Sequence, residues 1–274
     1  MLNTKSSTRL PGNLILLLMM VVTILPLLSM LFTALQPQGS LPAGLSFPRE
    51  AHWENFATAF ETSNFLALAQ SSTFIVIATV PAAVLIATLA GYGLAHLQIP
   101  GERFFTVLFL LGLTLPMEAI ITPLFYQLKG MGLVGSQWSI ILPQMALLMP
   151  FGVFWMRANF LNASKELSES AQLDGANVWQ VFRRIHLPLA IPAWASLSVL
   201  YFIWTWNQFL LAIVMVNDPT KRTMAGALGA FKAERSTDFV LLCAGSLLIM
   251  LPSLLIFLIF QRHFIKALMQ GAVK

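Results

Sequence analysis

The feature that most constrains the fold of this chain is a series of long intervals without ionised side chains. Five intervals contain no Asp, Glu, Lys or Arg, and a sixth, between Arg103 and Lys129, contains only Glu118. The five run over residues 10–48, 62–101, 130–156, 185–217 and 239–261. An α-helix needs about 20 apolar residues to cross the hydrocarbon layer of a bilayer. Each interval therefore predicts one membrane span.

These intervals predict an all-α, multi-pass membrane protein in which residues 1–274 form a single transmembrane domain with six helices. The spans are expected near residues 12–35, 70–97, 104–126, 138–157, 191–216 and 239–260. Charged residues make up only 10% of the chain, against about 25% in soluble domains, so a water-soluble globule is excluded. Cys243 is the one cysteine in the sequence, which excludes a disulfide-stabilised secreted domain as well.

The distribution of Lys and Arg predicts how the helices are oriented. With six spans, both termini lie on one side of the membrane, and the loops on that side carry ten of the 16 basic residues. An excess of basic residues marks the cytoplasmic side, so both termini are expected in the cytoplasm. Because these charges are spread over loops beside the membrane, the net charge of +5 indicates lipid headgroups rather than nucleic acid as their partner.

The sequence lacks the motifs of the common catalytic and nucleotide-binding sites. It has no Walker A phosphate-binding loop, no HExxH zinc motif and no GxSxG nucleophile motif. The four histidines are too scattered along the chain for a metal-ligand motif. We therefore expect no catalytic residue, no metal site and no cofactor bound by this chain, and a protein that is not an enzyme.

The longest loop on the predicted cytoplasmic side, residues 158–190, lies between the fourth and fifth spans. A short helix is expected to end at Asp174 and Gly175, because glycine permits a left-handed turn. Asp174 can cap a second helix near Val178–Ile185, which is expected to stop at Leu187-Pro188. The pattern predicts two short helices that meet at a glycine elbow against the membrane. An ordinary amphipathic surface loop would show the same pattern, whereas a DNA-reading helix-turn-helix is disfavoured because both loop ends lie beside the bilayer.

Three short segments give this loop a specific resemblance. They are Glu169-Ser170-Ala171, Asp174-Gly175-Ala176 and Ile185-His186-Leu187-Pro188. Their spacing resembles that of the EAA loop of binding-protein-dependent ABC importers, with Ser170 in place of the middle alanine. Other segments are similar to the carbohydrate branch of that family and its maltose-type second permease. They are Trp206-Asn207-Gln208 in the fifth span, the tail at residues 261–274, and residues 90–96, where His96 replaces a common Arg.

The resemblance implies a permease subunit that forms half of the translocation pathway for a sugar or related polyhydroxylated solute. The implied partners are a second homologous permease, an ATPase dimer that binds ATP-Mg, and an extracytoplasmic solute-binding protein, assembled at a bacterial cytoplasmic (inner) membrane. The loop would bind the ATPase as a coupling helix, through Glu169, Ser170, Ala171, Asp174, Gly175, Ile185, Leu187 and Pro188. The last residues of the chain would make a second ATPase contact, through Gly271, Ala272, Val273 and Lys274.

Polar residues inside the spans are candidates for the solute pathway. Glu118 is the one acidic residue within a predicted span, and an ionised group at the bilayer centre costs about 2.5–3.5 kcal/mol on insertion scales. It is therefore expected to face the bundle or water, as a gate, a ligand or a hydrogen-bonded strut. Asn207 and Gln208, close to Trp204, combine amide groups with a flat apolar face, which suits a sugar. Polar contacts between helices are the alternative role for these residues.

Two other functions fit parts of the sequence. An ion-coupled secondary carrier would use Glu118 as its proton or cation site and would need no ATP. A membrane scaffold without transport activity would leave both Glu118 and the elbow loop unexplained.

Overall fold

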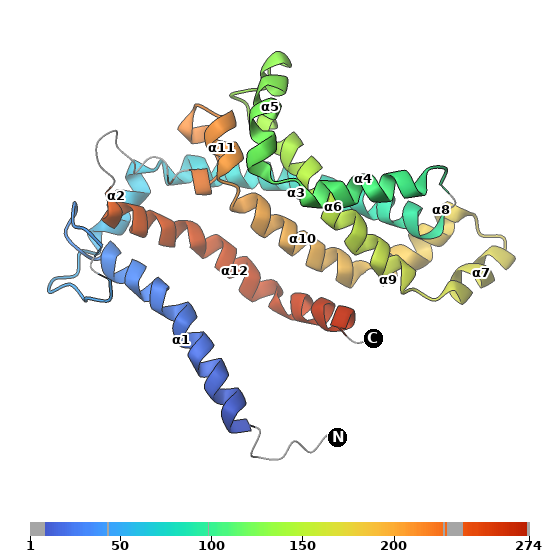
Figure 1. Cartoon of the computed structure of the whole chain (residues 1–274), viewed down its shortest axis with the longest axis horizontal. Helices are drawn as coiled ribbons and strands as arrows, with labels where there is room; N and C mark the ends of the chain where they lie inside the picture. The colour runs from blue at the N-terminus through green and yellow to red at the C-terminus, as the bar shows by residue number, and fades with distance from the viewer. Residues whose placement is uncertain (1–8, 43, 98, 227, 229–237, 273–274) are drawn as a thin grey trace. The chain divides into compact units, whose positions relative to one another are not determined.

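The computed structural model describes residues 9–42, 44–97, 99–226, 228 and 238–272, and every regular element within these ranges is helical (Figure 1). The long helices are α1 (Arg9–Ala34), α3 (Phe65–His96), α6 (Trp138–Leu161), α10 (Ile191–Trp206) and α12 (Phe239–Ala272). The shorter elements are α2 (Glu54–Thr62), α4 (Glu102–Thr114), α5 (Met117–Gly130), α7 (Lys165–Leu173), α8 (Val178–Val181), the π-helical turn η2 (Phe182–His186), α9 (Leu187–Leu189), α11 (Leu210–Met215) and the 3₁₀ turn η3 (Pro219–Lys221). The expectation of an all-α chain is confirmed.

Several of these helices are long and apolar enough to cross a membrane. Four helical segments are long and apolar enough by themselves: Gly12–Ala34, Phe65–His96, Trp138–Leu161 and Phe239–Gln261. Two bent pairs of helical segments are long and apolar enough only when each pair is taken as one span, namely α4 with α5 and Val178–Leu189 with α10. The described residues therefore hold four to six candidate spans. Six spans, with both termini in the cytoplasm, stay a prediction.

The third predicted span, residues 104–126, is not one continuous helix. α4 ends at Thr114, α5 begins at Met117, and the two helices meet at 106°. Between them Leu115 is extended, with φ −75° and ψ 117°. The ring of the following Pro116 disfavours the helical conformation for the residue before it. The proline therefore marks a break between two helices.

The fifth predicted span, residues 191–216, is also interrupted. α10 ends at Trp206 and α11 starts at Leu210, so three residues with the sequence Asn-Gln-Phe separate them. At the other end, Ala190 joins α9 to α10, and the segment Val178–Leu189 is bent by 70° from α10.

The chain divides into two compact units, one of which is made of Leu66–Gly226 and Pro252–Lys274. Its core forms where α6 approaches α3 and α10. A Cβ atom added to Gly91 would lie 2.7 Å from the Cβ of Met156, and one added to Gly152 would collide with the hydroxyl of Tyr201. Each contact therefore requires a residue without a side chain. Figure 1 shows α7, α8 and α9 at the end of this unit that lies away from α11.

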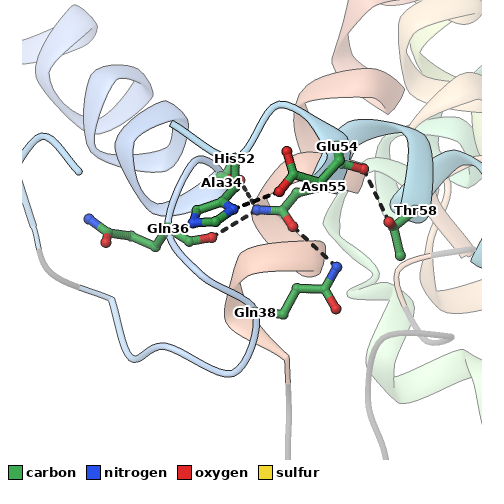
Figure 2. A network of polar contacts seen from close by, with 7 residues as sticks. All are labelled: Ala34, Gln36, Gln38, His52, Glu54, Asn55 and Thr58. Carbon is green, nitrogen blue, oxygen red and sulfur yellow. Dashed lines mark hydrogen bonds and ion pairs between the residues drawn. The ribbon is translucent and has the colours of Figure 1, made fainter. Parts of the chain in front are cut away.

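The other unit contains α1, α2 and the first part of α12. Figure 2 shows how the buried Asn55 joins α2 to the end of α1. Its Nδ2 donates hydrogen bonds to the carbonyl oxygens of Ala34, at 2.9 Å, and Gln36, at 2.8 Å. Its Oδ1 accepts a hydrogen bond from Nε2 of Gln38 at 3.2 Å. One side chain thus satisfies carbonyl groups that the end of α1 leaves without helical partners.

Candidate functional site

The glycine elbow between α7 and α8 has the geometry of a helix C-terminus closed by a left-handed residue. Gly175 has φ +83°. Its N–H donates to the carbonyl of Gln172 at 3.0 Å, and the N–H of Ala176 donates to the carbonyl of Ala171 at 2.9 Å. These are the two hydrogen bonds of a Schellman motif, in which Asp174 is the C-cap of α7. The predicted position of the elbow is therefore observed.

The prediction that Asp174 caps the second helix is wrong. Asn177 is the N-cap of α8: its side chain accepts a hydrogen bond from the backbone N–H of Gln180 at 2.9 Å. Gln180 Oε1 in turn accepts from the backbone N–H of Asn177 at 2.8 Å, which completes a capping box. Asp174 is already the C-cap of α7, and the N-cap of α8 is therefore Asn177.

The second helix of the loop also does not stop at Leu187-Pro188. α8 widens into the π-turn η2, in which the N–H of Leu187 donates to the carbonyl of Phe182. The chain continues as α9 and then, through Ala190, as α10. Pro188 lies in the first turn of α9, where a missing N–H costs no helical hydrogen bond. The loop is therefore continuous with the fifth span.

A hollow of about 450 Å³ lies inside the elbow. Its walls are Ala171, Asp174, Gly175, Ala176, Gln180, Val181, Arg184 and Ile185. Four of the eight predicted coupling residues are among them, namely Ala171, Asp174, Gly175 and Ile185. Of the other four, Glu169, Ser170 and Pro188 are exposed and Leu187 packs against the core of the unit. The hollow carries both an acidic and a basic side chain and is open to a partner.

The loop has one face fixed and one face free. Phe182 is buried, with its ring centroid 4.7 Å from that of Tyr92 in α3 and 6.5 Å from that of Phe160 in α6. At the elbow, by contrast, the side chain of Leu173 is 89% exposed. Sequence reasoning missed Leu173, although an apolar residue directly before an Asp-Gly turn was a usable signal. This exposure leaves an apolar side chain at the tip of the elbow, on the face that is not packed against the spans.

The break in the fifth span is held by Gln208. Its Nε2 donates to Oε1 of Gln144 in α6 at 2.8 Å, and its Oε1 accepts from the N–H of Leu211 at 3.3 Å. Its backbone carbonyl accepts a hydrogen bond from the hydroxyl of Thr223. Sequence reasoning missed Gln144, which is a buried polar residue in α6. Gln208 therefore closes the gap between α10 and α11, and its place in the solute pathway stays a prediction.

Asn207 and Trp204 are more accessible than Gln208. Asn207 ends α10 and is exposed; its Nδ2 donates to the carbonyl of Ile203 at 2.9 Å and contacts the hydroxyl of Ser253 at 3.5 Å. Trp204 is 40% exposed, and its ring meets that of Phe151 edge to face, with centroids 5.0 Å apart. Both side chains lie one turn apart on α10, with surface left for a ligand.

Glu118 is exposed in the first turn of α5, where the helix dipole favours a negative charge. Its neighbour Met117 places Sδ 3.9 Å from Nε2 of Gln208. Within the described ranges, Glu118 forms no ion pair and no side-chain hydrogen bond with Trp204, Asn207 or Gln208. The structure therefore brings Met117, rather than Glu118, to the break after α10.

The predicted C-terminal contact is only partly visible. Gly271 and Ala272 form the last turn of α12, while Val273 and Lys274 lie outside the described residues. Among the residues that the structure describes, no group of three or more His, Cys, Asp or Glu side chains is arranged to hold a metal ion.

Comparison with known proteins identifies the chain. The model of the family of binding-protein-dependent transport system inner membrane components matches residues 83–270. The chain belongs to this family. The probable ABC transporter permease protein YurM of Bacillus subtilis is 37% identical over 185 residues, which are 68% of this chain. The match covers 62% of YurM, which is less than two thirds of its length. The diacetylchitobiose uptake system permease protein NgcG of Streptomyces coelicolor is 30% identical over 263 residues, 95% of this chain and 87% of that protein.

A solved structure shows the same fold. It is described as a bacterial ABC transporter involved in the import of the acidic polysaccharide alginate, and it matches with a TM-score of 0.74 and 20% sequence identity. The match covers 95% of this chain and 98% of the chain in that structure.

Family membership confirms the resemblance seen in the EAA loop. The chain is a permease subunit of a binding-protein-dependent ABC importer, a membrane component that does not itself catalyse ATP hydrolysis. The ion-coupled carrier and the non-transporting scaffold are both disfavoured by this result.

Proposed function

We propose that this chain is one of two permease subunits of an ABC importer for an oligosaccharide or related polyhydroxylated solute in a bacterial inner membrane. A second permease completes the pathway, a solute-binding protein delivers the solute from outside, and an ATPase dimer binds ATP-Mg on the cytoplasmic side. The loop 158–190 couples the pathway to that ATPase.

The observation that carries this proposal is the two-faced loop. Phe182 belongs to the core of the unit and the adjacent Val181 is buried, so we expect the second half of the loop to move with the spans. The elbow at Gly175 and the side chain of Leu173 are exposed and point to a partner. A stiff element that is fixed at one end and free at the other can transmit a displacement between two proteins. Such a contact is needed because the sequence has no nucleotide-binding motif of its own.

A sugar is supported by the named substrate of a relative and by the group at the break in the fifth span. The relative NgcG is described as a diacetylchitobiose permease. In this chain Asn207 offers an amide and Trp204 a flat ring, both exposed, whereas the amide of Gln208 is already engaged by Gln144. Amide groups bind sugar hydroxyls, and aromatic rings pack on sugar C–H faces. We therefore assign Asn207 and Trp204, rather than Gln208, to the solute.

Reconstitution tests the proposal. The chain is assembled in liposomes with its partner permease, ATPase and solute-binding protein, and uptake of labelled oligosaccharides, diacetylchitobiose included, is measured with and without ATP. Uptake that requires both ATP and the binding protein is expected. The chain alone, given a proton or sodium gradient, should take up nothing. Gradient-driven uptake by the chain alone would contradict the proposal and favour the carrier that uses Glu118.

A further inference from the structure

Two histidines that are far apart in the sequence pack against each other, with tilted rings, where the loop meets the spans. His96 lies at the end of α3 and His186 at the end of η2, and their ring centroids are 4.3 Å apart. Ser168 of α7 completes the group, since its Oγ lies 2.7 Å from Nε2 of His186. These three residues, called the His96–His186–Ser168 cluster below, join α3, η2 and α7 at one point.

The surroundings of this cluster are apolar and closed. His186 is only 1% exposed. Its ring centroid lies 5.4 Å from that of Tyr92 and 6.1 Å from that of Phe160. Its Nδ1 has no hydrogen-bond partner among the residues that the structure describes. A second proton on this ring would therefore add a positive charge without solvent around it and without a carboxylate to pair with.

The charged groups of the neighbouring elements do not offset such a charge. Arg157 of α6 donates to the carbonyl of Leu94 and pairs with Glu102 at 3.1 Å. The remaining charged side chains described on η2 and α7 are exposed: Arg183, Arg184, Glu166 and Glu169. From α3 the titratable groups that face His186 are Tyr92 and His96. Burial, and then the neighbouring His96, lower the pKa of His186 below its usual value.

We propose that the His96–His186–Ser168 cluster fastens the coupling loop to α3 only while the His186 imidazole is neutral, so that acidification of the cytoplasm releases the loop and uncouples transport from ATP hydrolysis. The proposal rests on the proposed role of the loop as the ATPase contact.

The direction and size of the effect follow from linkage. Above about pH 6.5, the ordinary pKa of histidine, His186 is neutral in both the fastened and the released loop, and the contact has its full strength. As the pH falls below this value, the released loop binds a proton while the fastened loop resists it, so the equilibrium moves toward release. At pH 5.5 a histidine with the ordinary pKa, as in the released loop, is about ten to one protonated. The equilibrium between the fastened and the released loop is therefore shifted toward release by up to about tenfold relative to pH 7.5.

The experiment is a pH profile of the reconstituted complex between pH 5.5 and 8, read as solute molecules taken up per ATP hydrolysed. Each variant is normalised to its own value at pH 7.5. In the wild type, the number of solute molecules taken up per ATP hydrolysed should fall several-fold between pH 7.5 and pH 5.5. His186→Gln, whose amide can still bond to the Ser168 hydroxyl but does not titrate, should give a flat profile. His52→Gln is the matched control, since His52 lies in the other unit and bonds to Glu54, and it should follow the wild type.

A second measurement keeps this test separate from the test of the function. In protein labelled with ¹³C,¹⁵N-histidine, the resonance that disappears in His186→Gln should titrate with a midpoint below 6.5. A midpoint at or above 6.5, or a His186→Gln profile that falls like the wild type, overturns the proposal. Absence of ATP-dependent uptake at pH 7.5 in the wild type would instead count against the proposed function, because the titration does not depend on transport.

Discussion

Replacement of Gly175 by valine addresses the coupling elbow directly. Gly175 has φ +83°, and a Cβ atom added to it meets no other atom within 4 Å. A Cβ atom at this position therefore meets nothing within the chain, and the strain of the substitution comes from the backbone. An L-residue in the left-handed region costs about 1–2 kcal/mol, and a β-branched residue belongs at the upper end. The strain is lost if the elbow opens.

This strain is large enough to matter for coupling but too small to unfold the chain. A cost of about 1–2 kcal/mol shifts an equilibrium between closed and open elbow by about 5–30-fold. We expect Gly175→Val to insert and assemble normally and to lose most of its solute uptake per ATP hydrolysed. Gly175→Asn should retain much more of the ratio, because asparagine tolerates the left-handed conformation better than other side chains do.

The assay compares uptake and ATP hydrolysis in the same liposomes, with Gly132→Val as the matched control. Gly132 also has a positive φ, +71°, and open space around its Cβ position, but it lies in the turn after α5. The same strain placed there should leave the ratio of uptake to hydrolysis unchanged. If Gly175→Val keeps the wild-type ratio, or if Gly132→Val loses it equally, the elbow is not the coupling contact.

Three further predictions test other contacts. Gln144→Leu removes the partner of the Gln208 amide, so uptake should fall several-fold, and Gln208→Leu should add little in the double variant because the two residues act as one pair. Tyr201→Phe removes the hydrogen bond to the Leu148 carbonyl and should lower the free energy of unfolding by about 1 kcal/mol, measured by thermal denaturation in detergent. Asn55→Ala leaves two carbonyl groups without donors and should cost about 1–3 kcal/mol in the same assay, with no change in the ratio of uptake to hydrolysis.

The helices and the elbow could be predicted because the signals that specify them are local. Long intervals without charge predict spans, and a glycine after a short polar helix predicts a left-handed turn, which Gly175 adopts. The wrong cap assignment shows where local rules stop. Asp174 and Asn177 are both good N-cap residues, three positions apart. The choice depends on the Schellman bonds of Gly175 and Ala176, which make Asp174 the C-cap of α7.

Pairings between distant residues could not be predicted in this way. Gln144 and Gln208 are 64 positions apart, and nothing in the sequence around either residue indicates the other as its partner. His96 and His186 lie on different elements, and they meet because the π-turn η2 carries His186 inward against the end of α3. Neither pair follows from periodicity or spacing, since each depends on how the helices pack. The break at Pro116 is intermediate: the proline predicts an interruption, but not the 106° angle.

Between the loop and the residues that we assign to the solute lies one helix, α10. α9 leads through Ala190 into α10, and the 16 residues of α10 end at Trp206, directly before Asn207. At 1.5 Å per residue this helix is about 24 Å long. It is fixed to α6 at two levels, by the bond from the Tyr201 hydroxyl to the Leu148 carbonyl and by the bond from Trp155 Nε1 to the Ala193 carbonyl at 3.1 Å. Because α10 cannot slide past α6 without breaking both bonds, we expect a displacement of the proposed coupling loop to move the two helices together. The interruption after Trp206 is then the point at which this motion changes the surroundings of Asn207.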